Sequence, residues 1–478
     1  MKRHPLFFAL IAAMGLAAAD PLFAQSTSKQ DEIKALKATV AKQQQQLNQQ
    51  QQDLQSLRDS ISRLEGEQSQ QQAQIQAQAS APPATAVAAA APSKSAAPTF
   101  TSAPGISVAF HGFIDATAFS QTKSFTFGNG QNAEYPVPGS HGSLSGVDVR
   151  NTRFMFDLTG AQVAGDWTGG AHLEMDFFGG NNGTGAYSQE QPLPRLRQAY
   201  MVLTNPTTGS TIKIGQQWDL MFPLDDLPDS LSHIAFPLGY GAGIIGWRFP
   251  GIVWQQDLNH GTDGPLWQFD LGAFEGAWNG NATTNDNYLT PGNVGFRPQV
   301  EAKISLAQKN DWMVFAAAHY SEINLAGVGD TEPTPIKRSF SSDAYELGGD
   351  WTPGNWIFKA VVYTGQGIGQ IFGDLSQFGD IKDTGGYGQV GYKFTSNWSA
   401  NLIYDTSKPN ENDVVTWLGN GSTGLLRSRQ SAANVQYSIG PFAYSLEYIH
   451  DILDSTTNGV NRNRTSGNQV NLSAFYKF

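Results

Sequence analysis

The sequence predicts an all-β fold: a 16-stranded antiparallel transmembrane β-barrel, preceded by an N-terminal α-helical coiled coil. From residue 106 onward, apolar and polar residues alternate with a period of two. The connections between these segments are short and long in turn, and the chain ends on an aromatic residue, Phe478. Strands with one lipid-facing side, joined by short turns at one end and long loops at the other, show this pattern.

The first residues predict export. Lys2 and Arg3 precede an apolar run from Leu6 to Ala19, which is too short to span a bilayer and is typical of a signal peptide. We therefore expect residues 1–24 to be removed, leaving the protein in the cell outer membrane with an N-terminal extension in the periplasm. A chain without cysteine gains no disulfide stabilisation, and the net charge of −11 argues against nucleic-acid binding.

Residues 31–79 predict a periplasmic coiled coil. Ile33, Val40, Leu47, Leu54 and Ile61 recur every seven residues, as one core position of a heptad requires. Glutamines occupy several core positions, so a disordered Gln-rich tract is the alternative. An isolated helix of this kind is unstable, so a coil implies an oligomer. Residues 80–104 are rich in Ala, Pro, Ser and Thr and predict a linker.

Residues 106–478 predict the barrel. In its last segment Val470, Leu472, Ala474 and Tyr476 alternate with polar residues, except at Phe475, and about 16 segments follow this rule. An even strand number places both barrel ends on the periplasmic side. The alternative is a soluble β-sandwich or β-solenoid, but aromatic residues at segment ends on the apolar face favour a membrane interface.

The third long loop, about Leu220 to Ile245, is expected to fold into the barrel. Its apolar stretch Ile234–Tyr240 would otherwise be exposed to water. The loop also holds Asp225, Asp226 and Asp229. An ordinary extracellular loop is the alternative.

Alternation also predicts which charges face the lumen. Arg195 and Arg197 lie opposite in parity to Tyr200 and Val202, although this segment can be read the other way. A basic set facing an acidic loop would create a transverse field that selects small dipolar or anionic solutes. The predicted pore-lining residues are Arg153, Arg195, Arg197, Lys213, Arg248, Arg297, Lys303, Asp225, Asp226 and Asp229.

Other motifs predict no chemistry. The glycines at 241, 243 and 246 match a dinucleotide-binding string but lack a strand–turn–helix context. His172, Glu174 and Asp176 share one face, where a metal is conceivable but carboxylate-rich lumen faces are common. No G-x-S-x-G string occurs. We therefore expect no enzyme activity, no catalytic residue, no metal and no cofactor.

The segment Arg195-Leu-Arg197-Gln-Ala-Tyr200, followed by Lys213-Ile-Gly215-Gln216, resembles the DcaP-like trimeric outer-membrane porin family. In architecture the chain also resembles phosphate-selective porins. This resemblance implies a homo-trimer that gives passive, partly selective diffusion of small, anionic solutes such as carboxylates and dicarboxylates.

Two other functions remain open at this stage. Lumen aromatics such as Phe113, Phe315 and Phe475 are compatible with a general or sugar-selective porin. In a different class, the chain could be an envelope tether or adhesin whose coil binds peptidoglycan or periplasmic partners. Expected partners are therefore outer-membrane lipid, further copies of the chain, small anions and envelope components, with no nucleic acid.

Overall fold

A computed structural model describes residues 99–103, 105–181, 191–275, 297–308, 311–324, 336–337 and 339–478. The chain divides into two compact units, residues 1–93 and 94–478, and the described residues belong to the second. The predicted signal peptide, the coiled coil and most of the linker lie outside the described residues. So do most of the loops that follow β9 and β11.

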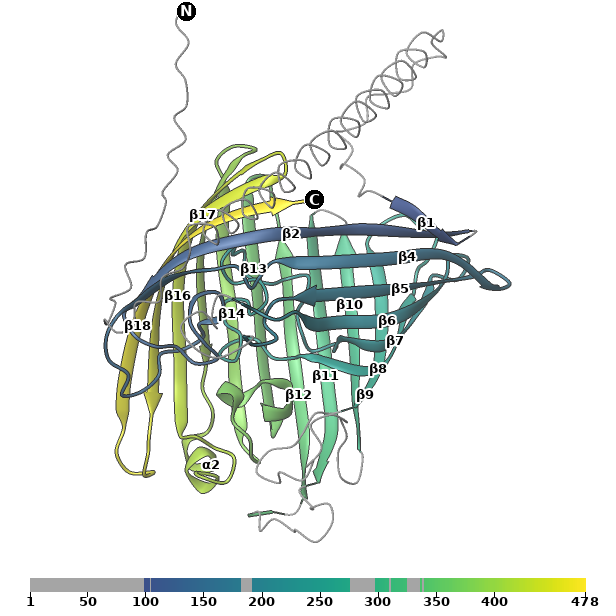
Figure 1. The fold of residues 1–478 in the computed structure, drawn as a ribbon. Helices are drawn as coiled ribbons and strands as arrows, with labels where there is room; N and C mark the ends of the chain where they lie inside the picture. The colour runs from purple at the N-terminus through teal and green to yellow at the C-terminus, as the bar shows by residue number, and fades with distance from the viewer. Residues whose placement is uncertain are drawn as a thin grey trace, which may run out of the picture. The chain divides into compact units, whose positions relative to one another are not determined.

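Within the described part, sixteen strands form a closed antiparallel ring, as predicted (Figure 1). The ring closes where β18 pairs with β2, from Gln469 opposite Gln121 to Lys477 opposite Phe113. The sixteen strands are β2 (Ile106–Gln121), β4 (Arg153–Ala164), β5 (Trp167–Asp176), β6 (Arg195–Asn205), β7 (Ser210–Trp218), β8 (Arg248–Asp257), β9 (Leu266–Glu275), β10 (Pro298–Gln308), β11 (Trp312–Asn324), β12 (Ser339–Trp351), β13 (Trp356–Gln366), β14 (Lys382–Lys393), β15 (Trp398–Ser407), β16 (Leu425–Ile439), β17 (Phe442–Ser455) and β18 (Asn463–Lys477).

Two short strands were not predicted. Strand β1 (Thr99–Ala103) lies inside the predicted linker and pairs with the start of β2, so the sheet begins before residue 106. Strand β3 (Leu144–Asp148) lies in the first long loop and pairs with the outer half of β2. Strand β2 is longer than the stretches that β4 and β18 cover, and the two short strands pair with backbone groups that would otherwise form open edges.

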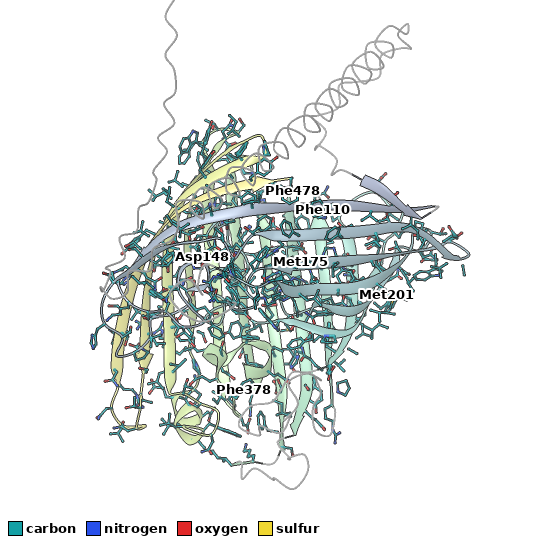
Figure 2. The ribbon with its side chains drawn as sticks, in the orientation of Figure 1. Phe110, Asp148, Met175, Met201, Phe378 and Phe478 are labelled. Atoms are coloured by element: carbon teal, nitrogen blue, oxygen red, sulfur yellow. The ribbon has the colours of Figure 1, made fainter. Side chains whose placement is uncertain are left out.

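The outward side of the ring is apolar and the inward side is polar, as the alternation predicted. Leu402, Leu472 and Val362 are among the most exposed large apolar residues, and all lie on outward positions. The C-terminal Phe478 packs against Phe110 of β2, with ring centroids 5.3 Å apart (Figure 2). Within the described residues, no helix is long and apolar enough to cross a membrane.

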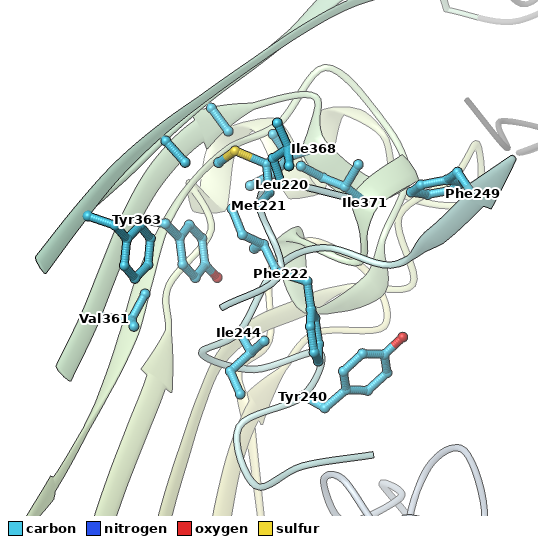
Figure 3. Close-up of a cluster of buried hydrophobic side chains, with 14 of the residues drawn as sticks. Leu220, Met221, Phe222, Tyr240, Ile244, Phe249, Val361, Tyr363, Ile368 and Ile371 are labelled. Atoms are coloured by element: carbon cyan, nitrogen blue, oxygen red, sulfur yellow. The ribbon is translucent and has the colours of Figure 1, made fainter. Parts of the chain in front are cut away.

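Loop L3, defined here as residues 219–247, folds into the barrel, which confirms that prediction. Its residues Leu220, Met221, Phe222, Tyr240 and Ile244 are buried against inward residues of β8, β9 and β11–β14 (Figure 3).

Loop L6, residues 367–381, packs against L3 inside the barrel and was not expected to turn inward. Ile368 and Ile371 belong to the same buried cluster as L3. L6 contains the short 3-10 helices η3 (Ile368–Ile371) and η4 (Asp374–Ser376). Two further helices lie among the described residues: η1 (Gly130–Asn132), in the first loop, and α2 (Glu411–Thr416), in the seventh loop.

The glycines of the rejected dinucleotide string have a structural role in L3. Gly246 adopts φ +103°, and a Cβ there would lie 2.5 Å from the Phe222 nitrogen and 2.6 Å from Asp219 Oδ1. We expect Gly246→Ala to lower the free energy of unfolding by about 2–4 kcal/mol, because backbone strain adds to a steric clash. Gly261→Ala is the control, since Gly261 also has a positive φ but open space around it. Equal losses in denaturant unfolding would contradict this explanation.

Candidate functional site

Polar contacts anchor L3 to the barrel wall at Asp229. Its carboxylate accepts hydrogen bonds from Lys359 Nζ at 2.9 Å and from Gln389 Nε2 at 2.6 Å. Its backbone carbonyl accepts from Asn434 at 2.7 Å and from Gln436 at 3.2 Å. Side chains of β13, β14 and β16 therefore hold the middle of the loop inside the lumen.

A cavity of about 530 Å³ lies beside L3, along the wall formed by β4–β11. It brings together Arg153, Arg197, Lys213, Lys303 and Asp225, which are half of the predicted pore-lining residues. Other side chains on its lining are Glu174, Tyr200, Trp218, Asp219 and Asp270. This cavity is the candidate solute-binding site.

Arginine–carboxylate pairs organise one wall of the cavity. Arg197 bonds to Glu174 and, at 2.7 Å, to Asp176. Arg195 also bonds to Asp176 at 2.7 Å, and Arg153 lies 3.2 Å from Glu174. The Arg197, Glu174 and Asp176 side chains are each less than 5% exposed, so these pairs form a buried network rather than a solvated surface.

A β-bulge settles which way β6 faces. Leu196 pairs with Met175 and Gln198 pairs with Glu174, so Arg197 is an extra residue without an opposite partner on β5. The bulge shifts the alternation by one position after Arg197. Arg197 and Tyr200 therefore both line the cavity, and the prediction that Tyr200 and Val202 lie on the opposite face to the arginines is wrong.

Aromatic rings surround the neighbouring arginines. The Arg248 guanidinium carbon lies 4.1 Å from the Trp247 ring centroid and 4.8 Å from that of Trp218. Arg195 lies 5.3 Å from Phe178 and 5.2 Å from Phe236. Cation–π contacts stabilise a guanidinium without neutralising its charge.

Unused hydrogen-bond donors remain in this group. Two nitrogens each of Arg153 and Arg248 are buried and form no hydrogen bond within the described part of the chain. Such donors are well suited to an anion, because buried polar groups without partners are costly.

Sequence reasoning missed Arg150, which bonds to Asp148 at 2.7 Å, because it lies in a turn where alternation gives no signal.

We expected the acids of L3 to form one surface opposite the arginines. They do not. Asp225 lines the cavity, but Asp229 is held by Lys359 on the far wall. Asp226 is fully buried, and its surroundings include Lys303, Lys359 and Asp350. Burial raises the pKa of Asp226 to about 7, with the Asp350 charge adding to the effect.

Arg297 is not part of the cavity. It precedes β10 at the outer end of the barrel and forms an ion pair with Glu322 at 3.1 Å. Both side chains are about half exposed. The alternation of residues correctly put Arg297 on the same face as Lys303. It could not show that the strand, and with it the inward wall, begins only after Arg297.

The His172, Glu174 and Asp176 face is engaged in ion pairs. His172 Nδ1 lies 2.6 Å from Asp157 Oδ1, while His111 Nε2 lies 2.6 Å from the other oxygen of Asp157. Glu174 and Asp176 are taken up by the arginines. Among the residues that the structure describes, no group of three potential ligands has the geometry to hold a metal ion.

Comparison with solved structures identifies the architecture. The outer membrane channel DcaP of Acinetobacter baumannii superimposes with a TM-score of 0.60 and 18% identity, covering 79% of this chain and 99% of that one. The chain has the fold of a DcaP-like porin. OmpF of Salmonella typhi, solved with daunomycin, superimposes with a TM-score of 0.50 and 14% identity, covering 78% of this chain and 98% of the porin.

The likeness to these porins rests on structure alone. No protein-family profile matches the sequence, and no curated protein matches it. The porin fold accounts for the closed ring and the outward apolar band. The residues around the cavity carry the functional argument.

Proposed function

We propose that the chain is a trimeric outer-membrane porin that gives passive, partly selective diffusion of small anionic solutes, including carboxylates. One observation carries the proposal: arginines of β4, β6 and β8 gather beside L3, and those of β4 and β8, Arg153 and Arg248, keep buried donors that no acceptor in the described part of the chain uses. A diffusing carboxylate would accept these hydrogen bonds, and charge-assisted bonds to arginine are stronger than neutral ones.

Acidic residues are numerous in the lumen, but many are separated from its water. Glu134 of the first loop and Asp374 of L6 are buried, and burial raises the pKa of both carboxyls well above their usual range. Groups held neutral in this way do not repel an anion. Lys213 and Lys303, by contrast, line the cavity and are only half-buried.

Within the cavity the charges favour an anion slightly. Four cationic side chains and four carboxyls line it. Burial raises the pKa of Asp219 well above its usual range, so its carboxyl is expected to be neutral. One positive charge is then in excess, which supports modest rather than strict anion preference.

Assembly as a homo-trimer remains part of the proposal. It rests on the heptads of residues 31–79, which lie outside the described residues, and on the porin fold. Cross-linking of the full chain in membranes would test it. Deleting residues 31–79 would show whether the coil sets the oligomer or attaches the barrel to the envelope.

Removing the two arginines with unused donors should reduce anion preference. Each charge attracts a monovalent anion at about 8 Å by about 0.7 kcal/mol at an effective dielectric of about 60 in a water-filled lumen, so the two together contribute about 1.4 kcal/mol. We therefore expect Arg153→Gln with Arg248→Gln to lower the chloride-to-potassium permeability ratio about tenfold. The measurement is the reversal potential of single channels in a salt gradient.

The control variant is Arg464→Gln. Arg464 pairs with Asp454 at 2.7 Å and is 65% exposed, so it should leave the permeability ratio unchanged. A wild-type channel that prefers potassium over chloride would refute the anion proposal. A barrel without any conductance would refute the porin proposal itself.

A sugar-selective porin is less well supported, because the candidate aromatic rings are already covered. Trp218 stacks on Phe222 at 3.8 Å, and Arg248 lies over the ring. Phe113 packs on Phe475, and Lys303 lies over Phe315. Liposome swelling with sugars compared with dicarboxylates would separate the two functions.

A further inference from the structure

Strands β12–β14 carry two cavities, one above the other along the strands. Register aligns Tyr345, Thr364 and Thr384 across the three strands near their outer ends. The upper cavity surrounds this row and the strand ends beyond it, and the lower groove lies toward the periplasm. Figure 1 shows β12, β13 and β14 as neighbours in the wall with their outer ends at the bottom of the picture, so the cavity called upper here lies toward the bottom of that view.

The upper cavity has a volume of about 730 Å³ and is polar. Lys382 and Lys408 line it, together with Thr364, Asn410 and Asn412. Both lysines are exposed, and no ion pair is observed for either within the described part of the chain. Three acids also line it: Asp343 within β12, Asp383 of β14, which is buried, and Glu411, which is paired with Arg462 at 3.2 Å.

The lower groove has a volume of about 680 Å³ and is apolar. Its floor is the row Gly349, Ala360 and Gly388, which register places side by side on outward positions. Larger outward residues flank it: Leu347 and Val362 toward the outer end, and Trp351, Phe358 and Val390 toward the periplasmic end. Small residues between large ones leave a channel on the lipid side of the wall.

We propose that these two cavities together bind one phosphorylated lipid of the outer leaflet. Its phosphate contacts the ammonium groups of Lys382 and Lys408, and an acyl chain lies in the groove over Gly349, Ala360 and Gly388. The two sites are separated by about six residues of strand, or about 20 Å, which matches a headgroup followed by an acyl chain.

The combination of features favours a lipid over other occupants. A soluble anion would use the lysines but not an apolar groove that faces hydrocarbon. A second protein chain would be expected to pair with the lysines through carboxylates, whereas lipid phosphates lie at this depth in any bilayer. Lysines at the membrane surface bind anionic headgroups with about 1 kcal/mol each, or about a fivefold gain in affinity.

The test is a titration of the purified full-length chain in detergent with lipid A, a phosphorylated glycolipid, followed by native mass spectrometry. Lys382→Gln and Lys408→Gln should each weaken binding about fivefold, and together about 25-fold. Lys393→Gln is the matched control, since Lys393 ends the same strand on the periplasmic side. It should bind lipid A like the wild type.

The groove is tested separately with Gly388→Leu. A Cβ at Gly388 meets only the Lys359 carbonyl oxygen, at 3.9 Å, so the added side chain fills the groove without a backbone clash. We expect weaker lipid A binding. If this variant does not fold, the lysine double variant still decides the question.

Three results would overturn the proposal. The first is equal lipid A binding by the wild type and the lysine double variant. The second is an equal loss of binding in Lys393→Gln. The third is displacement of lipid A by millimolar inorganic phosphate together with full binding by Gly388→Leu, which would make the upper cavity a site for free phosphate.

Discussion

Replacing Arg197 by glutamine is expected to destabilise the barrel by about 3–5 kcal/mol. The Arg197 side chain is 1% exposed and bonds to Glu174 and Asp176, which are equally buried. Removing one partner of a buried ion pair leaves an uncompensated charge, and this loss exceeds the net value of the pair. Unfolding in guanidinium chloride, monitored by tryptophan fluorescence, would measure the change.

Two further variants separate the ion-pair effect from loss of volume. Arg197→Gln combined with Glu174→Gln removes charge on both sides and should recover part of the stability. Lys213→Gln removes a cavity cation that has no carboxylate within ion-pair distance in the described part, and should cost less than about 1 kcal/mol. If Arg197→Gln costs no more than Lys213→Gln, the arginine network does not stabilise the wall.

Stability should also fall between about pH 4 and pH 7 because of Asp226. Burial raises the pKa of this carboxyl to about 7 in the folded chain, against 3.8 when unfolded. The folded state therefore holds the proton more tightly, and the stabilisation is fully present below about pH 4. It is lost as the pH rises to about 7, and amounts to about 2–4 kcal/mol.

The difference between wild type and Asp226→Asn isolates this group. Asparagine does not titrate, so the variant should lose less stability between pH 4 and pH 8 in thermal unfolding. Asp263→Asn, in an exposed turn, is the control and should follow the wild type. Parallel pH profiles for wild type and Asp226→Asn would show that Asp226 is ionised in the folded chain.

The barrel was predictable from sequence because each strand carries its own signal. The alternation at Val470, Leu472 and Tyr476 predicts an outward face, and no tertiary contact has to be known for this. The lengths of turns and loops predict the topology. The inward course of L3 followed from one apolar stretch, Ile234–Tyr240. The inward course of L6 did not, because residues 367–381 mix polar and apolar residues without a clear pattern.

The site was only partly predictable, because alternation gives the face of a side chain but not its partner. Lys213 and Lys303 were expected in the lumen, yet only the closed ring brings them to one cavity. Trp218 and Trp247 were missed because they lie at a strand end and in a loop. Arg297 was wrongly predicted to line the pore, since the alternating run of residues continues beyond the end of β10, where the inward wall stops.

The bulge at Arg197 separates two properties of the pore. The number of strands and their stagger set the width of a barrel. A bulge adds one residue to one strand and leaves both unchanged, yet it turns every later side chain of that strand over. Deleting Arg197 would keep Tyr200 opposite His172 on the inward face, whereas a strand of the same length without the bulge would pair Arg197 with Glu174 and turn Tyr200 to the lipid side. The presence or absence of one bulge can thus change which β6 side chains line the wall without a change in the number of strands.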